Sequence, residues 1–330
     1  MTAIFRSNNP LSLILLFISG MAFRYASFIV PGSPVTGNMD GILYQILLNG
    51  LGIYGKPFPL IYPLLVYLLI FSQALMLNSM MYTHRLLPKA NYIPAYCYLL
   101  ATSVFSEWWN LSSALIINTF VIWSWGRMMT LYKTQSVKNL LFNIGLVAGI
   151  SSFFYFPSLG FLFLILISLS IVRAFNITEW LVCILGLLTP YYFYIAWQMM
   201  HNQWNWKSYF PALSIDMPAI RHSNWPMGGL VVLLLPFLIS WLFQQENLRR
   251  TLIQVRKGWA LMLLYLAFCF LVPFVNASSG IQNWLLCAMP IAAYQTNIYQ
   301  SGRKAIVPNI IQFLMIIFIL LMNFSYLKSA

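Results

Sequence analysis

Long apolar runs, separated by short polar or Gly/Pro-rich connections, follow one another along the whole chain. A helix needs about 20 mostly apolar residues to cross a bilayer. On that basis we expect about 11 spans, near residues 10–30, 58–81, 92–106, 111–126, 139–155, 158–174, 180–199, 228–245, 258–275, 281–296 and 307–326. The connections at 107–110 and 156–158 are very short, so a merged or re-entrant hairpin at either place is an alternative. The pattern predicts an all-α, polytopic protein in which residues 1–330 form a single integral membrane domain.

The distribution of basic residues predicts the orientation of these runs in the membrane. Cytoplasmic loops of membrane proteins carry an excess of Lys and Arg. If the N-terminus is inside, most of the 18 basic residues fall in the inner loops. The outer side then holds Lys56, Lys207, Arg221 and Lys328, with Arg24 near the outer end of the first run. The bias therefore predicts the N-terminus inside and the C-terminus outside.

The segment GILYQILLNGLGIY, residues 41–54, has apolar residues at helical spacing but is too short and polar to cross a membrane. It belongs to the first outer loop, 31–57. Such a segment is typical of a helix that lies in the membrane surface. We expect an interfacial helix there.

Composition agrees with a membrane protein, since 61% of residues are hydrophobic and 7% are charged. A soluble domain carries about 25% charged residues. The net charge of +13 could suggest nucleic acid, but the basic residues stand in short clusters between apolar runs, which argues against nucleic-acid binding. Each of the four cysteines lies within an apolar run and none has metal-ligand spacing, so we interpret them as packing residues.

Asp40 directly precedes the interfacial segment, in a chain with five acidic residues. On the predicted topology no acid lies at the centre of a span, which weakens the case for an ion-coupled transporter. Two compatible roles remain open for this position. Asn38 or Asp40 could cap the helix that follows, and Asp40 could serve as a general base.

The outer loop 200–227 is the richest polar segment, with Lys207, Asp216, Arg221 and His222 among several aromatic residues. Cations beside aromatics suit an anionic, partly apolar ligand such as a lipid phosphate. An ordinary interfacial aromatic belt with solvated charges is the alternative. Arg24 either extends to the outer interface or pairs with Asp40 or with a phosphate.

The layout resembles the GT-C glycosyltransferases, which use polyprenyl-phosphate sugars. The stretch FRYASFIVPGSPVTGNMDGILYQ matches their span end, first outer loop and acidic residue, and loop 200–227 would be the later contribution to the same cavity. The resemblance implies an isoprenoid-phosphate donor, Asp40 as catalytic base, and Arg24, Lys207, Asp216, Arg221 and His222 as substrate-binding residues. Asp40 lacks a paired acid, so a divalent cation is unsupported and the cofactor stays unknown. The opening MTAIFRSNNPLSL is similar to an uncharacterised group of Bacteroidota inner-membrane proteins.

The sequence thus predicts a multi-pass protein of the inner membrane that transfers a sugar to an acceptor on the outer, periplasmic face. Two other functions remain open. One is a carrier or flippase for an anionic lipid-linked molecule. The other is a non-catalytic membrane subunit with a protein partner in the cell envelope, whose basic inner loops dock on membrane lipids.

Overall fold

The computed structural model describes residues 2–6, 9–132, 137–201, 224–248, 251–275, 281–300 and 306–329. Within these ranges every regular element is a helix. The α-helices are α1 Thr2–Phe5, α2 Pro10–Ala22, α3 Tyr25–Ile29, α4 Ile42–Gly55, α5 Ile61–Thr83, α6 Ile93–Ser103, α7 Ser113–Thr130, α8 Val137–Ser152, α9 Phe161–Val172, α10 Ile177–Met200, α11 Asn224–Leu248, α12 Ile253–Leu271, α13 Ala288–Gln300 and α14 Ile306–Ser329. The 3-10 helices are η1 Ser106–Trp109, η2 Phe156–Gly160, η4 Val272–Phe274 and η5 Gln282–Cys287.

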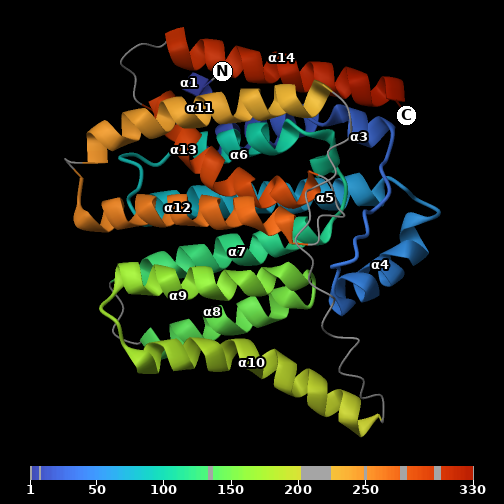
Figure 1. Ribbon diagram of the computed structural model, residues 1–330. Helices are drawn as coiled ribbons and strands as arrows, with labels where there is room; N and C mark the ends of the chain where they lie inside the picture. The colour runs from blue at the N-terminus through green and yellow to red at the C-terminus, as the bar shows by residue number, and fades with distance from the viewer. Residues whose placement is uncertain are drawn as a thin grey trace.

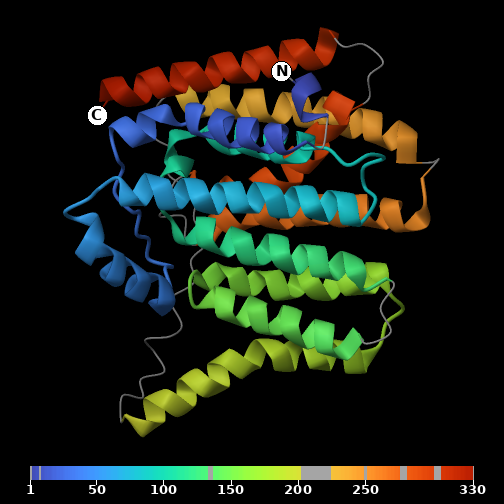
Figure 2. The ribbon, with the colours of Figure 1, turned by 180° about the vertical axis from the view of Figure 1, so that it is seen from behind.

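The all-α prediction is confirmed, and each predicted apolar run contains a helix. Most of these helices lie side by side along a common direction, with α14 at one edge of the bundle and α10 at the other (Figures 1 and 2). Among the described residues, five helices are long and apolar enough to cross a membrane: α5, α10, α11, α12 with η4, and α14. The other runs hold shorter helices, so length and composition alone support several spans.

The first predicted span, 10–30, is broken into α2 and α3 at Phe23 and Arg24. A break exposes backbone groups that the helix would otherwise satisfy, and in an apolar setting these need other partners. Asn323 of α14 supplies them: its Nδ2 donates to Phe23 O at 2.9 Å, and its Oδ1 accepts from Ala26 N at 3.1 Å. One buried amide from the last helix therefore stabilises the break in the first run.

Helix α10 packs tightly on α8 through glycines. A Cβ atom on Gly145 would lie 2.1 Å from Cys183 O, and one on Gly186 would lie 2.3 Å from Phe142 O. Small residues allow membrane helices to approach this closely. Pro190 lies inside α10, and the second half of the helix tilts away from the bundle (Figure 1). A proline in a helix interior is a common cause of such a bend.

Helix α4 covers the segment predicted to be an interfacial helix. It stands at one end of the bundle, inclined to the other helices (Figures 1 and 2). The predicted capping by Asn38 or Asp40 is wrong: the residue at the N-cap is Gly41, and no side chain of the described residues caps the helix. The Asp40 carboxylate instead accepts hydrogen bonds from Gly37 and Ser113, which are described with the candidate site.

Candidate functional site

The loop before α4 is fastened to the start of α7. Val35 N donates to Leu111 O at 2.8 Å. The Tyr44 hydroxyl, from the first turns of α4, is 2.8 Å from Val35 O and 3.1 Å from Leu111 O. Tyr44 is fully buried, so α4 is anchored by a side chain that closes over the loop. The loop that carries Asp40 is therefore fixed in place.

Asp40 forms an isolated antiparallel β-bridge with Tyr155, which lies in the turn between α8 and η2. The two flanking backbone bonds are Gly41 N to Phe154 O, 2.8 Å, and Phe156 N to Met39 O, 3.0 Å. Because these bonds flank the pair, Asp40 and Tyr155 occupy the non-hydrogen-bonded position. In that position the two side chains stand close together on the same face.

Gly41 makes this bridge possible. A Cβ atom at Gly41 would lie 2.0 Å from Phe153 O, a distance at which backbone atoms collide. Only glycine lets the two backbone segments approach so closely at this point. Gly41 thus allows the loop that carries Asp40 to pack against the α8–η2 turn.

Both carboxylate oxygens of Asp40 accept hydrogen bonds. Oδ2 accepts from Gly37 N at 2.6 Å, and Oδ1 accepts a short bond from the Ser113 hydroxyl at the first residue of α7. Burial raises the pKa of Asp40 above its ordinary 3.8, and the bonds from Ser113 and Gly37 oppose that rise. The carboxyl is partly exposed. It is therefore an oriented group whose basicity exceeds that of a free aspartate.

The Tyr155 hydroxyl is the unusual group of the site. The side chain is 2% exposed, and its oxygen has no hydrogen-bond partner among the described residues. Buried hydroxyls in native proteins nearly always have a partner. An unpartnered hydroxyl beside an oriented carboxylate is a place where a hydroxyl of a ligand, or a water, completes the hydrogen bonding.

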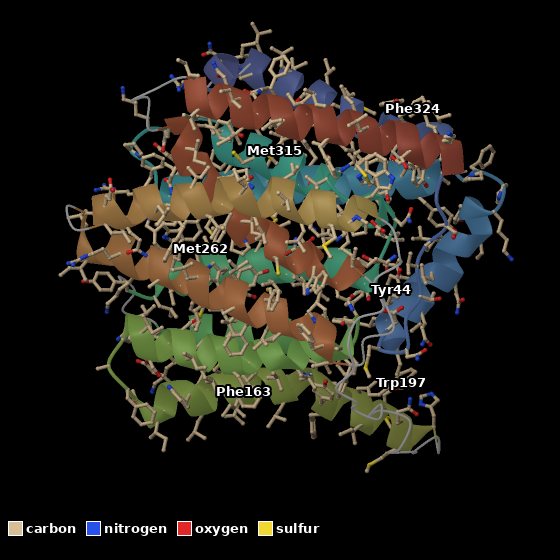
Figure 3. The ribbon with its side chains drawn as sticks, turned by 45° about the horizontal axis from the view of Figure 1, so that its top comes forward. Tyr44, Phe163, Trp197, Met262, Met315 and Phe324 are labelled. Carbon is tan, nitrogen blue, oxygen red and sulfur yellow. The ribbon has the colours of Figure 1, made fainter. Side chains whose placement is uncertain are left out.

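Helix α10 connects the region of this site to the outer loop 200–227, which the sequence predicts to be the second part of the site. Tyr191 and Tyr194 pack on the ring of Phe153, with centroids 4.8 and 5.3 Å apart. Tyr44 and Trp197 lie at the same end of the bundle (Figure 3). His201, at the end of α10, is about 10 Å of helix beyond Tyr194.

Four predicted substrate-binding residues follow in that loop. Lys207, Asp216, Arg221 and His222 lie outside the described residues. Their contribution to the site stays a prediction.

The structure places Arg24 elsewhere. Its side chain is 1% exposed, and one terminal nitrogen donates to the Thr102 hydroxyl of α6 at 2.6 Å. The predicted extension to the outer interface is therefore wrong, because the break between α2 and α3 turns the side chain into the bundle. Nor does Arg24 form an ion pair with Asp40; among the described residues the one ion pair joins Arg173 and Glu179.

A polar network in the bundle interior bears on the carrier alternative. The Tyr98 hydroxyl lies 2.5 Å from Gln73 Oε1 and 2.7 Å from Asn118 Nδ2, and Gln73 Nε2 donates to Leu115 O at 2.8 Å. All three side chains are fully buried. Saturated, enclosed networks of this kind hold membrane helices together. None of the cavities in the described part of the chain that the structure gives is lined by Gln73, Tyr98 or Asn118.

Sequence reasoning found Asp40 but missed Ser113 and Tyr155. Both lie next to the very short connections at 107–110 and 156–158, where a merged or re-entrant hairpin is the alternative to two spans. Short turns between helices bring their flanking residues to one end of a bundle. That placement was the available signal. Among the described residues no group of His, Cys, Asp and Glu side chains could hold a metal ion.

Comparison with known proteins places the chain in a family. The family model described as a family of unknown function, DUF6427, matches residues 44–330. The match begins at Tyr44, so Ser113 and Tyr155 fall within it and Asp40 stands just ahead of it. No curated protein and no solved structure matches the chain. The chain belongs to the DUF6427 family.

Proposed function

We propose that this protein is a multi-pass glycosyltransferase of the bacterial inner membrane. It takes a sugar from an isoprenoid-phosphate donor and transfers it to an acceptor hydroxyl on the outer face. In this proposal about 11 segments cross the membrane, with the N-terminus inside and the C-terminus outside. Asp40 and α4 then lie on the outer face, where a membrane-bound donor presents its sugar.

The observation that carries the proposal is the pairing of Asp40 with Tyr155. A catalytic base needs a carboxylate with raised basicity, held in one orientation and able to reach a substrate proton. Asp40 is oriented by Gly37 and Ser113, and its pKa is raised by burial. The unpartnered Tyr155 hydroxyl beside it provides a hydrogen-bonding group for the acceptor or the sugar.

The reaction uses these groups in a single displacement. Asp40 removes the proton from the acceptor hydroxyl as its oxygen attacks the anomeric carbon of the sugar. The bond between that carbon and the phosphate oxygen breaks, and the electron pair leaves with the isoprenoid phosphate. Attack opposite the leaving group inverts the anomeric centre. Cations that bind the phosphate stabilise the charge that develops on it.

Lys207 and Arg221 are assigned the donor phosphate, with Asp216 and His222 beside them, in the loop that follows α10. Arg24 is given no part, because its guanidinium is enclosed by the bundle. The carrier and the non-catalytic subunit remain alternatives. The filled, hydrogen-bonded interior around Gln73 and Tyr98 favours the transferase over the carrier.

The test is Asp40→Asn in a strain that lacks the native gene. We expect loss of one surface glycan or glycoprotein product at normal protein level, because asparagine keeps the shape but cannot take the proton. Glu107→Gln is the matched control, since it removes one acid in η1, outside the Asp40–Tyr155 pair. Normal product in the Asp40→Asn strain would refute the proposal.

A further inference from the structure

The largest described cavity lies where the end of α11, the start of α12, the end of α13 and the α5–α6 connection meet. Its volume is about 450 Å³. Figure 1 shows α13 running between α11 and α12, which pack on it from either side. Six of the lining residues are Arg85, Phe243, Gln244, Leu252, Asn297 and Gln300. Among the described residues, the lining therefore combines a cation, several amides and apolar side chains.

Arg85 stands at this cavity in a backbone conformation that favours glycine. Its φ is 54°, the one positive φ of a non-glycine residue in the described chain. Arg85 N donates to Tyr82 O at 3.0 Å and Leu86 N donates to Met81 O at 3.0 Å. This is the Schellman pattern of a helix end, whose left-handed position is usually glycine. Here the position instead presents an exposed guanidinium, which forms no hydrogen bond or ion pair with the described chain.

The amides of the cavity add donors. Gln244 is 7% exposed. The side-chain nitrogen of Gln300 is buried and donates to no group of the described chain. Within the described residues no acidic side chain lines the cavity. Glu246 follows Gln244 by two positions, so it points to a different face of α11. A guanidinium with amide donors and no carboxylate is suited to an anion.

The location narrows the anion to a phosphate group. The cavity lies at the end of the bundle that carries Arg6, Arg173 and Lys257, and Phe243 and Leu252 extend its wall toward apolar helix surface. Arginine binds phosphate oxygens in a forked, two-bond geometry. Basic pockets between membrane helices accept phosphate headgroups of anionic lipids. A free phosphate has the same group without the apolar part.

We propose that this cavity binds a phosphate group, with Arg85 and the Gln300 amide as its contacts. The site is at the opposite end of the bundle from Asp40 and is independent of the proposed transferase activity. The backbone of Arg85 has an unfavourable positive φ, whereas its guanidinium binds the phosphate. Stability and binding therefore respond in opposite directions to the same substitution.

The experiment uses the purified full-length chain in detergent, with three probes. The first is inorganic phosphate against chloride at equal ionic strength, and the others are phosphatidylglycerol and phosphatidylcholine. Arg85→Gly should melt at or above the wild-type temperature, since glycine suits the left-handed position. It should bind the phosphate probe about tenfold more weakly, the loss expected for one charge-assisted contact. Lys89→Gly, an exposed cation of the same connection that does not line the cavity, should bind normally.

The probes separate the two sources of phosphate. Binding of inorganic phosphate supports a soluble ligand, and binding of phosphatidylglycerol alone supports a lipid headgroup. The proposal is overturned if the wild type binds neither inorganic phosphate nor phosphatidylglycerol. It is equally overturned if the wild type binds phosphatidylcholine as tightly as phosphatidylglycerol. It is also overturned if Arg85→Gly binds as well as the wild type, or if Lys89→Gly weakens binding equally.

Discussion

Asp40 and Tyr155 stand side by side as the non-hydrogen-bonded pair of an isolated antiparallel bridge. The Asp40 carboxylate accepts hydrogen bonds from two donors, whereas the buried Tyr155 hydroxyl has no hydrogen-bond partner in the part of the chain that the structure describes. They come from the first long loop and from the turn between α8 and η2. The bridge fixes both backbones, so the two groups are held together without a direct bond between them. The site can therefore be tested through either residue.

Tyr155→Phe removes the unpartnered hydroxyl and keeps the ring. We expect the free energy of unfolding to stay the same or rise by about 1 kcal/mol, because a buried polar group without a partner is lost. Product formation should fall if the hydroxyl binds substrate. Thermal unfolding and the glycan assay measure the two effects separately. A clear loss of stability would show that the hydroxyl already has a partner in the membrane, such as a water.

The raised pKa of Asp40 predicts a pH dependence. In the folded state the carboxyl binds a proton more tightly than in the unfolded state, so stability falls as pH rises from about 4 through the folded pKa. Asp40→Asn should remove this part of the slope in melting temperature against pH, whereas Glu107→Gln should leave it. Product formation should rise over the same window, since the base must be deprotonated. An unchanged slope in Asp40→Asn would contradict the assignment.

Gly41→Ala should break the bridge. The added methyl would lie 2.0 Å from Phe153 O, and backbone must shift to relieve the contact. We expect a loss of about 1–3 kcal/mol in unfolding free energy and loss of product. Gly50→Ala is the matched control within α4, because a Cβ there meets nothing within 4 Å. Alanine at that position should be neutral or stabilise by up to about 1 kcal/mol. Equal effects of both substitutions would argue against a specific contact at Gly41.

Arg24→Met should stabilise the protein. Two guanidinium nitrogens of Arg24 are buried and have no hydrogen-bond partner within the described ranges. The Thr102 hydroxyl keeps its own bond to Tyr98 O at 2.7 Å when the arginine is removed. Replacing a poorly compensated buried charge by an apolar side chain of similar length often gains about 1–4 kcal/mol. Thermal unfolding in detergent and in lipid nanodiscs measures this gain. A loss of stability in nanodiscs alone would show that a lipid phosphate reaches Arg24.

The sequence by itself determined the helices. Each predicted apolar run contains a helix, because run length and apolar content act locally along the chain. It also identified the amphipathic segment that became α4 and the acid ahead of it. Hydropathy does not predict where a helix breaks within an apolar run. The break at Phe23 and Arg24 depends on Asn323, from the last helix.

Only the tertiary structure decided what Asp40 contacts. Ser113 is 73 residues away in sequence, and Tyr155 is further still, so no local pattern links them. The predicted helix cap is wrong because the Asp40 carboxylate accepts hydrogen bonds from donors outside α4, namely Gly37 N and the Ser113 hydroxyl. Arg24 was expected at the surface for its charge, and packing turned it inward. Local apolar periodicity fixes which segments become helices, whereas the partners of a polar side chain depend on which segments the fold brings together.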